Sequence, residues 1–290
     1  MLIKLKNKNI EFTVDTFGAQ MMSIIKNGTE YLWQGNPKYR ADRAPTLFPS
    51  IGRLPNDSYK FMGKTYNMSL HGFAWNSEYE VKEKGEDFVI LALNSNNETL
   101  PIYPFEFEFD VIYRLVENTV EITYEVDNKS DKTMPFAVGG HPGFNVPLEN
   151  YEDFTDYYLE FSTECMPDKF EFSEKILLNA RDTLFPLEEN KRISLTHDLF
   201  DDDSITLKNM ARKVTLRSKK SSHSVCLEFP QMPYFSIWHM PKTDAPYVCL
   251  EPWTSLISRH DIIEEFSCRS DLIHLTKNNT YKNTWTITIE

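Results

Sequence analysis

Residues 105–126 read FEFEFDVIYRLVENTVEITYEV, and this stretch decides the fold. Apolar and polar side chains alternate through two runs, Phe105–Leu115 and Val120–Val126, on either side of the polar pair Glu117-Asn118. Successive side chains of a β-strand point to opposite faces, so a period of two is typical of strands that bury one face. A short polar break between two such runs is typical of a turn. The stretch therefore predicts two long strands joined by a turn.

The same alternation recurs along almost the whole chain. Further runs are Ile10–Val14, Tyr79–Glu83, Phe88–Leu93, Val214–Leu216, Val225–Phe229, Phe235–Met240, Tyr247–Leu250 and Trp285–Ile289. Lys84-Gly85-Glu86 separates two of them as a predicted hairpin. The longest helix candidates, Leu184–Glu189 and Asp261–Glu265, are short. We predict an all-β fold: a large antiparallel β-sandwich in which residues 1–290 form a single domain.

Composition excludes several classes of protein. The chain has 290 residues, of which 41% are hydrophobic, enough for a large core. A net charge of −12 disfavours nucleic acid and anionic membranes as partners. No apolar run approaches the roughly 20 residues of a membrane-spanning helix. The alternating start, Met1–Lys6, indicates a strand and not the apolar segment of a signal peptide.

The cysteines Cys165, Cys226, Cys249 and Cys268 are scattered and form no Cys-x-x-Cys pair. This spacing gives no support for a zinc ribbon or a redox motif. Free cysteines in apolar runs behave as small buried hydrophobes. We therefore expect a cytoplasmic protein with reduced thiols. A homodimer is compatible with the sequence.

One histidine stands where a strand gives way to glycines and prolines. Residues 136–147 read FAVGGHPGFNVP, with His141 at the centre. Glycine permits positive φ or close backbone approach, and proline fixes φ, so a rigid sheet can present a reactive side chain there. Histidine exchanges protons near neutral pH. A buried histidine that bonds a turn carbonyl is an equally good interpretation of this stretch alone.

Two other residues share this setting. His71 also lies beside glycine after an apolar stretch. Glu251 ends the run Tyr247–Leu250 and precedes Pro252-Trp253, so its carboxylate should lose water and its pKa should rise, which suits a general base. The alternative for Glu251 is a salt bridge to Arg53 or Arg259.

Taken in order, the motifs resemble those of one family, the aldose 1-epimerases or galactose mutarotases. The segments that carry the resemblance are Gly52–Asn56, His71–Ala74, Gly140–Asn145 and Cys249–Trp253. The order, the spacing and the chain length are all similar to the family pattern, over essentially the whole chain. The resemblance implies a β-sandwich with an open sugar cleft, a small sugar as substrate, and neither a metal nor an organic cofactor.

The resemblance also implies roles for individual residues. Glu251 looks like the base that removes the anomeric proton, and His141 like the acid that protonates the ring oxygen. His71 looks like the second histidine, which hydrogen-bonds near the reacting atoms. The pairing makes chemical sense in itself, because ring opening needs one proton removed and one donated across a single C–O bond.

The sugar-binding residues depart from the family pattern. Family members place an arginine after the asparagine, but here Asn56 is followed by Asp57, so Arg53 is the candidate replacement. The aspartate that binds sugar hydroxyls should lie within Asp201–Asp203, and Asp203 is favoured because a strand follows it. A solvated loop or a cation site is the alternative for these aspartates. Trp238 is the aromatic residue we expect at the sugar.

Other functions remain as alternatives. The remaining histidines show no metal-ligand spacing, and the cysteines no catalytic motif. A glycosidase with two carboxylates is a further alternative, because the sequence does not give the separation of its carboxylates. The main rival is a non-catalytic carbohydrate-binding β-sandwich, which the aromatic content of 13% would suit. For the epimerase we expect a neutral, uronate or otherwise modified aldose, since the loop cluster Arg40, Arg43 and Arg53 is a weak basis for a phosphate subsite.

Overall fold

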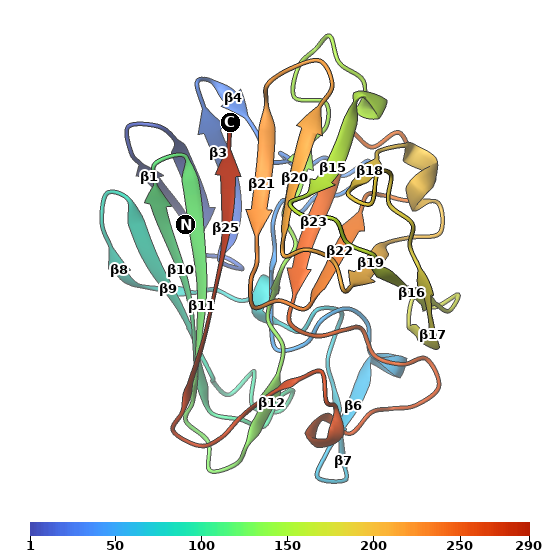
Figure 1. Ribbon diagram of the computed structural model, residues 1–290. Helices are drawn as coiled ribbons and strands as arrows, with labels where there is room; N and C mark the ends of the chain where they lie inside the picture. The colour runs from blue at the N-terminus through green and yellow to red at the C-terminus, as the bar shows by residue number, and fades with distance from the viewer.

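The computed structural model describes residues 1–290, with side chains described for residues 1–179 and 181–290. Its regular structure is almost entirely β, as Figure 1 shows. The helical segments are single 3-10 turns: η1 (Pro55–Asp57), η2 (Ala74–Asn76), η3 (Phe154–Asp156), η4 (His197–Phe200) and η5 (Phe266–Cys268). The predicted all-β antiparallel fold is confirmed.

One layer of the molecule is a nine-stranded sheet. Its strands in spatial order are β18 (Arg192–Ser194), β15 (Tyr157–Phe161), β20 (Lys213–Ser218), β21 (Ser224–Glu228), β25 (Thr280–Ile289), β11 (Thr119–Asn128), β10 (Phe107–Val116), β9 (Phe88–Asn94) and β8 (Glu80–Lys84). The stretch quoted first forms β10 and β11, which pair in register from Phe107 with Asn128 to Val116 with Thr119. The predicted hairpin around Gly85 joins β8 and β9.

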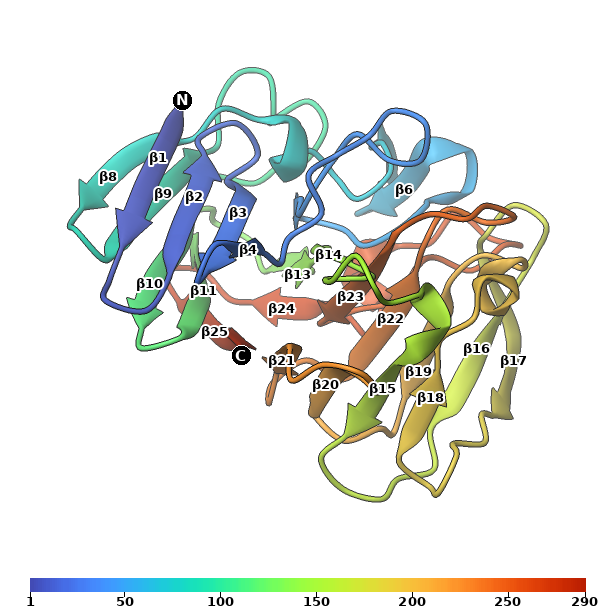
Figure 2. The same ribbon diagram turned by 90° about the horizontal axis from the view of Figure 1, so that it is seen from above.

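The facing layer consists of a four-stranded and an eight-stranded sheet, and Figure 2 shows both layers from above. The four-stranded sheet contains β1 (Leu2–Lys6), β2 (Glu11–Asp15), β3 (Gln20–Lys26) and β4 (Thr29–Glu30). The eight-stranded sheet runs β17 (Leu178–Leu184), β16 (Asp168–Phe172), β19 (Ile205–Lys208), β22 (Tyr234–Trp238), β23 (Tyr247–Trp253), β13 (Gly139–Gly140) and β5 (Thr46–Leu47), with β14 (Gly143–Asn145) also paired to β23. Small two-stranded sheets join β12 (Met134–Phe136) to β24 (Ile273–Leu275), and β6 (Ser58–Phe61) to β7 (Lys64–Asn67).

Burial follows the period of two. In β11 every second residue from Val120 to Asn128 is buried. The buried side chains join those of the facing sheets in a hydrophobic core that includes residues from Ile3 to Ile289. Burial of apolar surface of this kind stabilises the fold by about 25 cal/mol per Å². Among the described residues, no helix has the length and apolar character needed to cross a membrane.

The two predicted helices are wrong. Leu184 is the last residue of β17, and Glu188 forms an isolated bridge to Arg192. Residues 261–265 form no helix, and Glu265 bridges to Lys60. In both segments pairing with neighbouring backbone overrides a weak local preference, as tertiary context commonly does.

Candidate active site

Strand register brings His141 and Glu251 together. β13 and β14 both pair with β23, and the backbone pairing is interrupted between them. The two flanking pairs are Gly139 with Trp253 and Gly143 with Cys249. His141 lies halfway between the two glycines and Glu251 halfway between their partners, so the two residues face each other across the gap. Directly opposed residues of an antiparallel pair have Cβ atoms about 4.5–5.5 Å apart, within reach of side-chain contact.

The glycines before His141 are required by their surroundings. A Cβ at Gly139 would lie 2.7 Å from the Trp253 ring, and one at Gly140 would lie 2.6 Å from the Trp285 ring. Two tryptophans therefore pack directly against the backbone that leads to the histidine. This packing explains why the sequence breaks its alternation there, and it holds His141 on a rigid part of the sheet.

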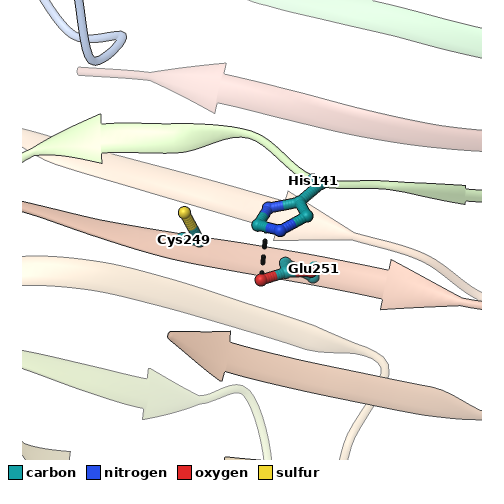
Figure 3. A group of neighbouring side chains, drawn as sticks. All are labelled: His141, Cys249 and Glu251. Carbon is teal, nitrogen blue, oxygen red and sulfur yellow. Dashed lines mark ion pairs between the residues drawn. The ribbon is translucent and has the colours of Figure 1, made fainter. Parts of the chain in front are cut away.

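The side chains of His141 and Glu251 approach each other, as Figure 3 shows. Nδ1 of His141 lies 3.2 Å from Oε1 of Glu251, and the Glu251 side chain is only 2% exposed. The two atoms are close but not aligned for a hydrogen bond, and Nδ1 has no hydrogen-bond partner among the described residues. The alternative partner Arg259 instead pairs with Glu264. Among the described residues, the ion-pair contact of Glu251 is therefore with His141 and with neither Arg53 nor Arg259.

Burial disfavours a charge on either residue. It raises the pKa of Glu251 well above its ordinary value, an effect that Arg40 opposes and Asp203 reinforces. It lowers the pKa of His141 well below its ordinary value, and the charges of Arg40 and of a protonated His71 add to that fall. A raised carboxylate pKa is the predicted property of a general base.

His71 is held by the backbone of another loop. Gly52 donates its backbone N–H to Nδ1 of His71 at 3.0 Å. Burial lowers the pKa of His71 to about 3, so the ring is neutral near pH 7 and its proton is on Nε2. The His71 ring meets the His141 ring edge to face at a centroid distance of 5.5 Å. His71 therefore offers a fixed N–H donor beside the His141–Glu251 pair.

A cavity of about 270 Å³ opens over these three residues. This volume is just below the roughly 300–1,000 Å³ range of sites for drug-sized molecules. Of the predicted site residues, the wall contains His71, His141, Glu251, Arg53, Asp203 and Trp238. Asn56 does not line this cavity but faces a neighbouring groove, which shares Arg53 and Ile176 with it.

The predicted sugar-binding residues differ in their exposure. Asp203 is partly buried in the cavity wall, whereas Asp201 and Asp202 are exposed. Burial raises the pKa of Asp203, and its Oδ1 accepts the Ser204 backbone N–H at 2.7 Å. Arg53 is exposed at the rim. The Trp238 ring lies 6.0 Å from that of His141, nearly perpendicular to it.

Arg40 is a cavity residue that was not predicted. Its Nη1 lies 2.7 Å from Sγ of Cys249, and its Nη2 donates to the His141 carbonyl at 3.0 Å. Arg40 occurs in a loop more than ninety positions before either partner. The only sequence signal was the cluster of arginines at 40, 43 and 53, and this cluster was considered only as a possible binding site for a phosphate group.

The site also contains atoms of the kind that bind metals. A His141 ring nitrogen, Cys249 Sγ and a Glu251 oxygen lie within 4.8 Å of one another. Imidazole, thiolate and carboxylate together suit zinc. However, the Arg40 guanidinium already contacts the sulfur at 2.7 Å and places a positive charge beside the three groups. We therefore interpret the trio as part of an acid–base site.

The fold and site define a class: a β-sandwich whose cavity brings a buried carboxylate and two histidines together. The profile of the aldose 1-epimerase family matches residues 1–288. The chain therefore belongs to the aldose 1-epimerase family.

Individual relatives agree with this assignment. The chain is 36% identical over 302 residues to the chromosomal protein LacX of Lactococcus lactis subsp. lactis, covering 100% of this chain and 99% of the relative. A galactose mutarotase related enzyme from Lactobacillus acidophilus superposes with a TM-score of 0.95 at 34% identity, covering 100% and 97% of the two chains. A galactose mutarotase-like protein from Lactobacillus casei ATCC 334 gives a TM-score of 0.94 at 30% identity, with both chains fully covered.

Proposed function

We propose that the protein is an aldose 1-epimerase, or mutarotase, that interconverts the α and β anomers of an aldose. The observation that carries the proposal is the approach of His141 Nδ1 to Glu251 Oε1, 3.2 Å apart in the wall of a sugar-sized cavity. Mutarotation requires two proton transfers at neighbouring oxygens, and this pair provides one group for each.

The two groups share one proton during the reaction. Glu251 as carboxylate removes the proton from the anomeric hydroxyl, while His141 as imidazolium gives a proton to the ring oxygen. The ring C–O bond breaks and an aldehyde forms, leaving Glu251 protonated and His141 neutral. After the aldehyde end rotates, His141 removes the proton from the chain hydroxyl and Glu251 protonates the aldehyde oxygen, so the ring closes with the opposite anomer.

The buried site is matched to the open-chain intermediate. Burial disfavours both the carboxylate and the imidazolium, so it favours the state in which Glu251 is protonated and His141 is neutral. This is the protonation state that ring opening produces and ring closure consumes. The desolvated pair therefore lowers the energy of the intermediate relative to the bound ring form.

His71 has a supporting role in this proposal. Its neutral ring presents Nε2–H, since Nδ1 accepts the Gly52 N–H. A fixed donor of this kind stabilises charge that develops on the ring oxygen or the anomeric oxygen. Because its pKa is lowered to about 3, His71 does not compete for the shared proton near pH 7.

The lining charges favour a substrate without a phosphate. The cavity wall combines two arginines, Arg40 and Arg53, with three carboxylates, Asp42, Asp203 and Glu251. Carboxylates and arginines both bind sugar hydroxyls, whereas the acidic side chains of Asp42 and Asp203 in the same wall disfavour a phosphate dianion. We also propose a cytoplasmic location, since all four cysteines are free thiols.

A non-catalytic carbohydrate-binding protein is the second candidate. The observation that favours it is the presence of three tryptophans in the cavity wall, Trp75, Trp238 and Trp253, because indole faces stack on sugar rings. Such a protein would bind a sugar equally well without the acid–base pair.

Polarimetry separates the two functions. Freshly dissolved α-glucose or α-galactose should approach its equilibrium rotation faster with the protein than in buffer alone. Glu251→Gln is the matched control, since it keeps the shape of the side chain and removes the base. Acceleration that is lost in this variant supports the epimerase. Sugar binding by both proteins without acceleration by either would establish the binding protein.

A further inference from the structure

Arg40 bridges the two strand segments that carry the acid–base pair. Nη2 donates to the carbonyl of His141, between β13 and β14, and Nη1 contacts Sγ of Cys249 on β23. Cys249 and Glu251 are two positions apart on one strand, so their side chains share a face. Figure 3 shows the thiol on the same side of the strand as His141 and Glu251. The guanidinium is therefore anchored beside both members of the pair.

The backbone and stem of Arg40 are held in place. Its carbonyl accepts hydrogen bonds from Trp33 Nε1 at 2.9 Å and from the Asn36 backbone N–H at 2.9 Å. The Arg40 guanidinium carbon lies 6.0 Å from the centre of the Trp238 ring, within cation–π range. A Cβ at Gly143 would lie 3.4 Å from Arg40 Nη1, so glycine leaves the guanidinium its space. These contacts hold the Arg40 side chain in one position, unlike a mobile arginine on the surface.

The charge of Arg40 is not neutralised by a contact ion pair. Among the side chains of residues 1–179 and 181–290, no carboxylate oxygen lies within 4.0 Å of its guanidinium nitrogens. Its known polar partners are a carbonyl and a thiol, neither of which carries a full charge. No paired negative charge offsets the guanidinium, so its positive charge acts almost undiminished on the nearby buried groups.

The effect of that field has the same sign on both members of the pair. Arg40 lowers the pKa of Glu251 and lowers the pKa of His141. Other ionisable groups beside the pair are Asp203, which raises the pKa of Glu251, His71, which lowers that of His141, and the Cys249 thiol, whose own pKa burial raises. Tyr247, whose pKa burial also raises, interacts with Glu251, and Asp42 and Arg53 line the same cavity wall. Removal of Arg40 would leave Asp203 as the strongest charge acting on Glu251.

We propose that Arg40 is a positioning residue of the acid–base pair, whose guanidinium, anchored on His141 and Cys249, limits His141 and Glu251 to one shared proton. A second proton would give imidazolium beside a neutral carboxylic acid, a state with no base to open the ring. Arg40 opposes this state because it places a fixed positive charge next to the pair. This inference rests on the proposed epimerase function for its kinetic consequences, but not for its electrostatics.

The kinetic test compares pH profiles of kcat/KM. In Arg40→Met and Arg40→Gln the acidic and basic limbs should both move to higher pH, by about one pH unit or more, the usual effect of removing a nearby charge. Arg40→Gln keeps a donor for the His141 carbonyl and serves if Arg40→Met does not fold. Arg40→Lys keeps the positive charge but lacks the forked N–H donors of the guanidinium. Both limbs of its pH profile should therefore lie close to those of the wild type.

Arg43→Met is the matched control. Arg43 lies in the same loop, but its Nη1 donates to the Met22 carbonyl and to Gln34. The acidic and basic limbs of the pH profile of Arg43→Met should lie at the same pH as those of the wild type. If Arg40→Met and Arg40→Gln lose activity by one factor at every pH, with both limbs unmoved, Arg40 acts only as a structural or sugar-contacting group and the proposal is wrong.

An infrared titration gives an answer that does not depend on activity. The carbonyl stretch of protonated Glu251 is identified as the band absent from Glu251→Gln. Its titration midpoint should rise in Arg40→Met relative to wild type, and an unchanged midpoint would overturn the proposal. If the wild type accelerates no aldose at all, the epimerase function fails, but the infrared midpoint still decides the role of Arg40.

Discussion

The backbone N–H of Gly52 donates to Nδ1 of His71 at 3.0 Å, and this contact determines how His71 can act. With Nδ1 occupied as an acceptor, the neutral ring has its only proton on Nε2. Both residues have left-handed backbones, with φ of 66° at Gly52 and 61° at His71. A non-glycine residue with positive φ is uncommon and is found repeatedly at functional sites.

Gly52→Ala should destabilise the protein more than Gly63→Ala. Both glycines have positive φ, and a side chain in that region costs about 1–2 kcal/mol. A Cβ at Gly52 would also lie 2.2 Å from Ile257, whereas nothing lies within 4 Å of one at Gly63. We expect an additional loss of about 1–3 kcal/mol for overpacking at Gly52. Urea unfolding measures both, and equal losses would show that the Ile257 contact relaxes without cost.

His71 should make the fold sensitive to acid. Its pKa is 6.5 before folding and about 3 in the folded state, so below pH 6.5 the unfolded chain binds a proton that the folded protein excludes. Stability is fully present above pH 6.5 and falls as the pH drops toward about 3, by about 1.4 kcal/mol per pH unit. His71→Asn removes the titration. Unfolding free energies measured at about pH 7 and pH 5 should therefore fall less in the variant than in wild type; equal falls would place His71 in solvent.

Loss of either member of the acid–base pair should reduce catalysis strongly. We expect His141→Asn and Glu251→Gln to lower kcat by about 10²-fold or more, as removal of a general acid or base does. His71→Asn should cost less, because a donor is lost but not a proton-transfer group. Circular dichroism checks that each variant folds. If both folded variants keep wild-type mutarotation, the mechanism is wrong and a sugar titration should follow.

The pH profile of kcat/KM should be bell-shaped, because the pair is active with one proton and inactive with two or none. The two limbs belong to the coupled pair and not to either residue alone. Asp203 raises the pKa of Glu251, so Asp203→Asn should shift the profile to lower pH, opposite to the shift expected for Arg40→Met. We also expect KM to rise, since Asp203 lines the cavity. A shift to higher pH would contradict this electrostatic account.

Alternation predicted most of the strands because burial of one face dominates a two-layer β-protein. It also located His141, since the break in alternation at Gly139-Gly140 reflects the tryptophans packed against these glycines. The short helices were mispredicted because these segments pair with other backbone: Leu184 ends strand β17, Glu188 bridges to Arg192, and Glu265 bridges to Lys60, far away in the sequence.

The site was predicted in part for the same physical reason. Glu251 lies on β23 and His141 lies between β13 and β14, which both pair with β23, and their motifs contain the glycines and prolines that shape the gap. The sequence around Arg40 has no comparable motif, because its contacts with His141 and Cys249 depend on how its loop crosses the sheet. The position of Asn56 outside the main cavity likewise depends on the left-handed turn at Asn56 and Asp57, with φ of 53° and 50°.

The position of β25 in the nine-stranded sheet has a consequence for how the chain folds. β25 lies between β21 and β11, so the nine-stranded sheet remains in two parts until residues 280–289 insert. Until then β11 and β21 are open edges, and open edges promote aggregation of partly folded chains. Pairing over such a sequence separation is also slow. Since Trp285 of β25 packs against Gly140, the support beneath His141 is completed only when β25 inserts.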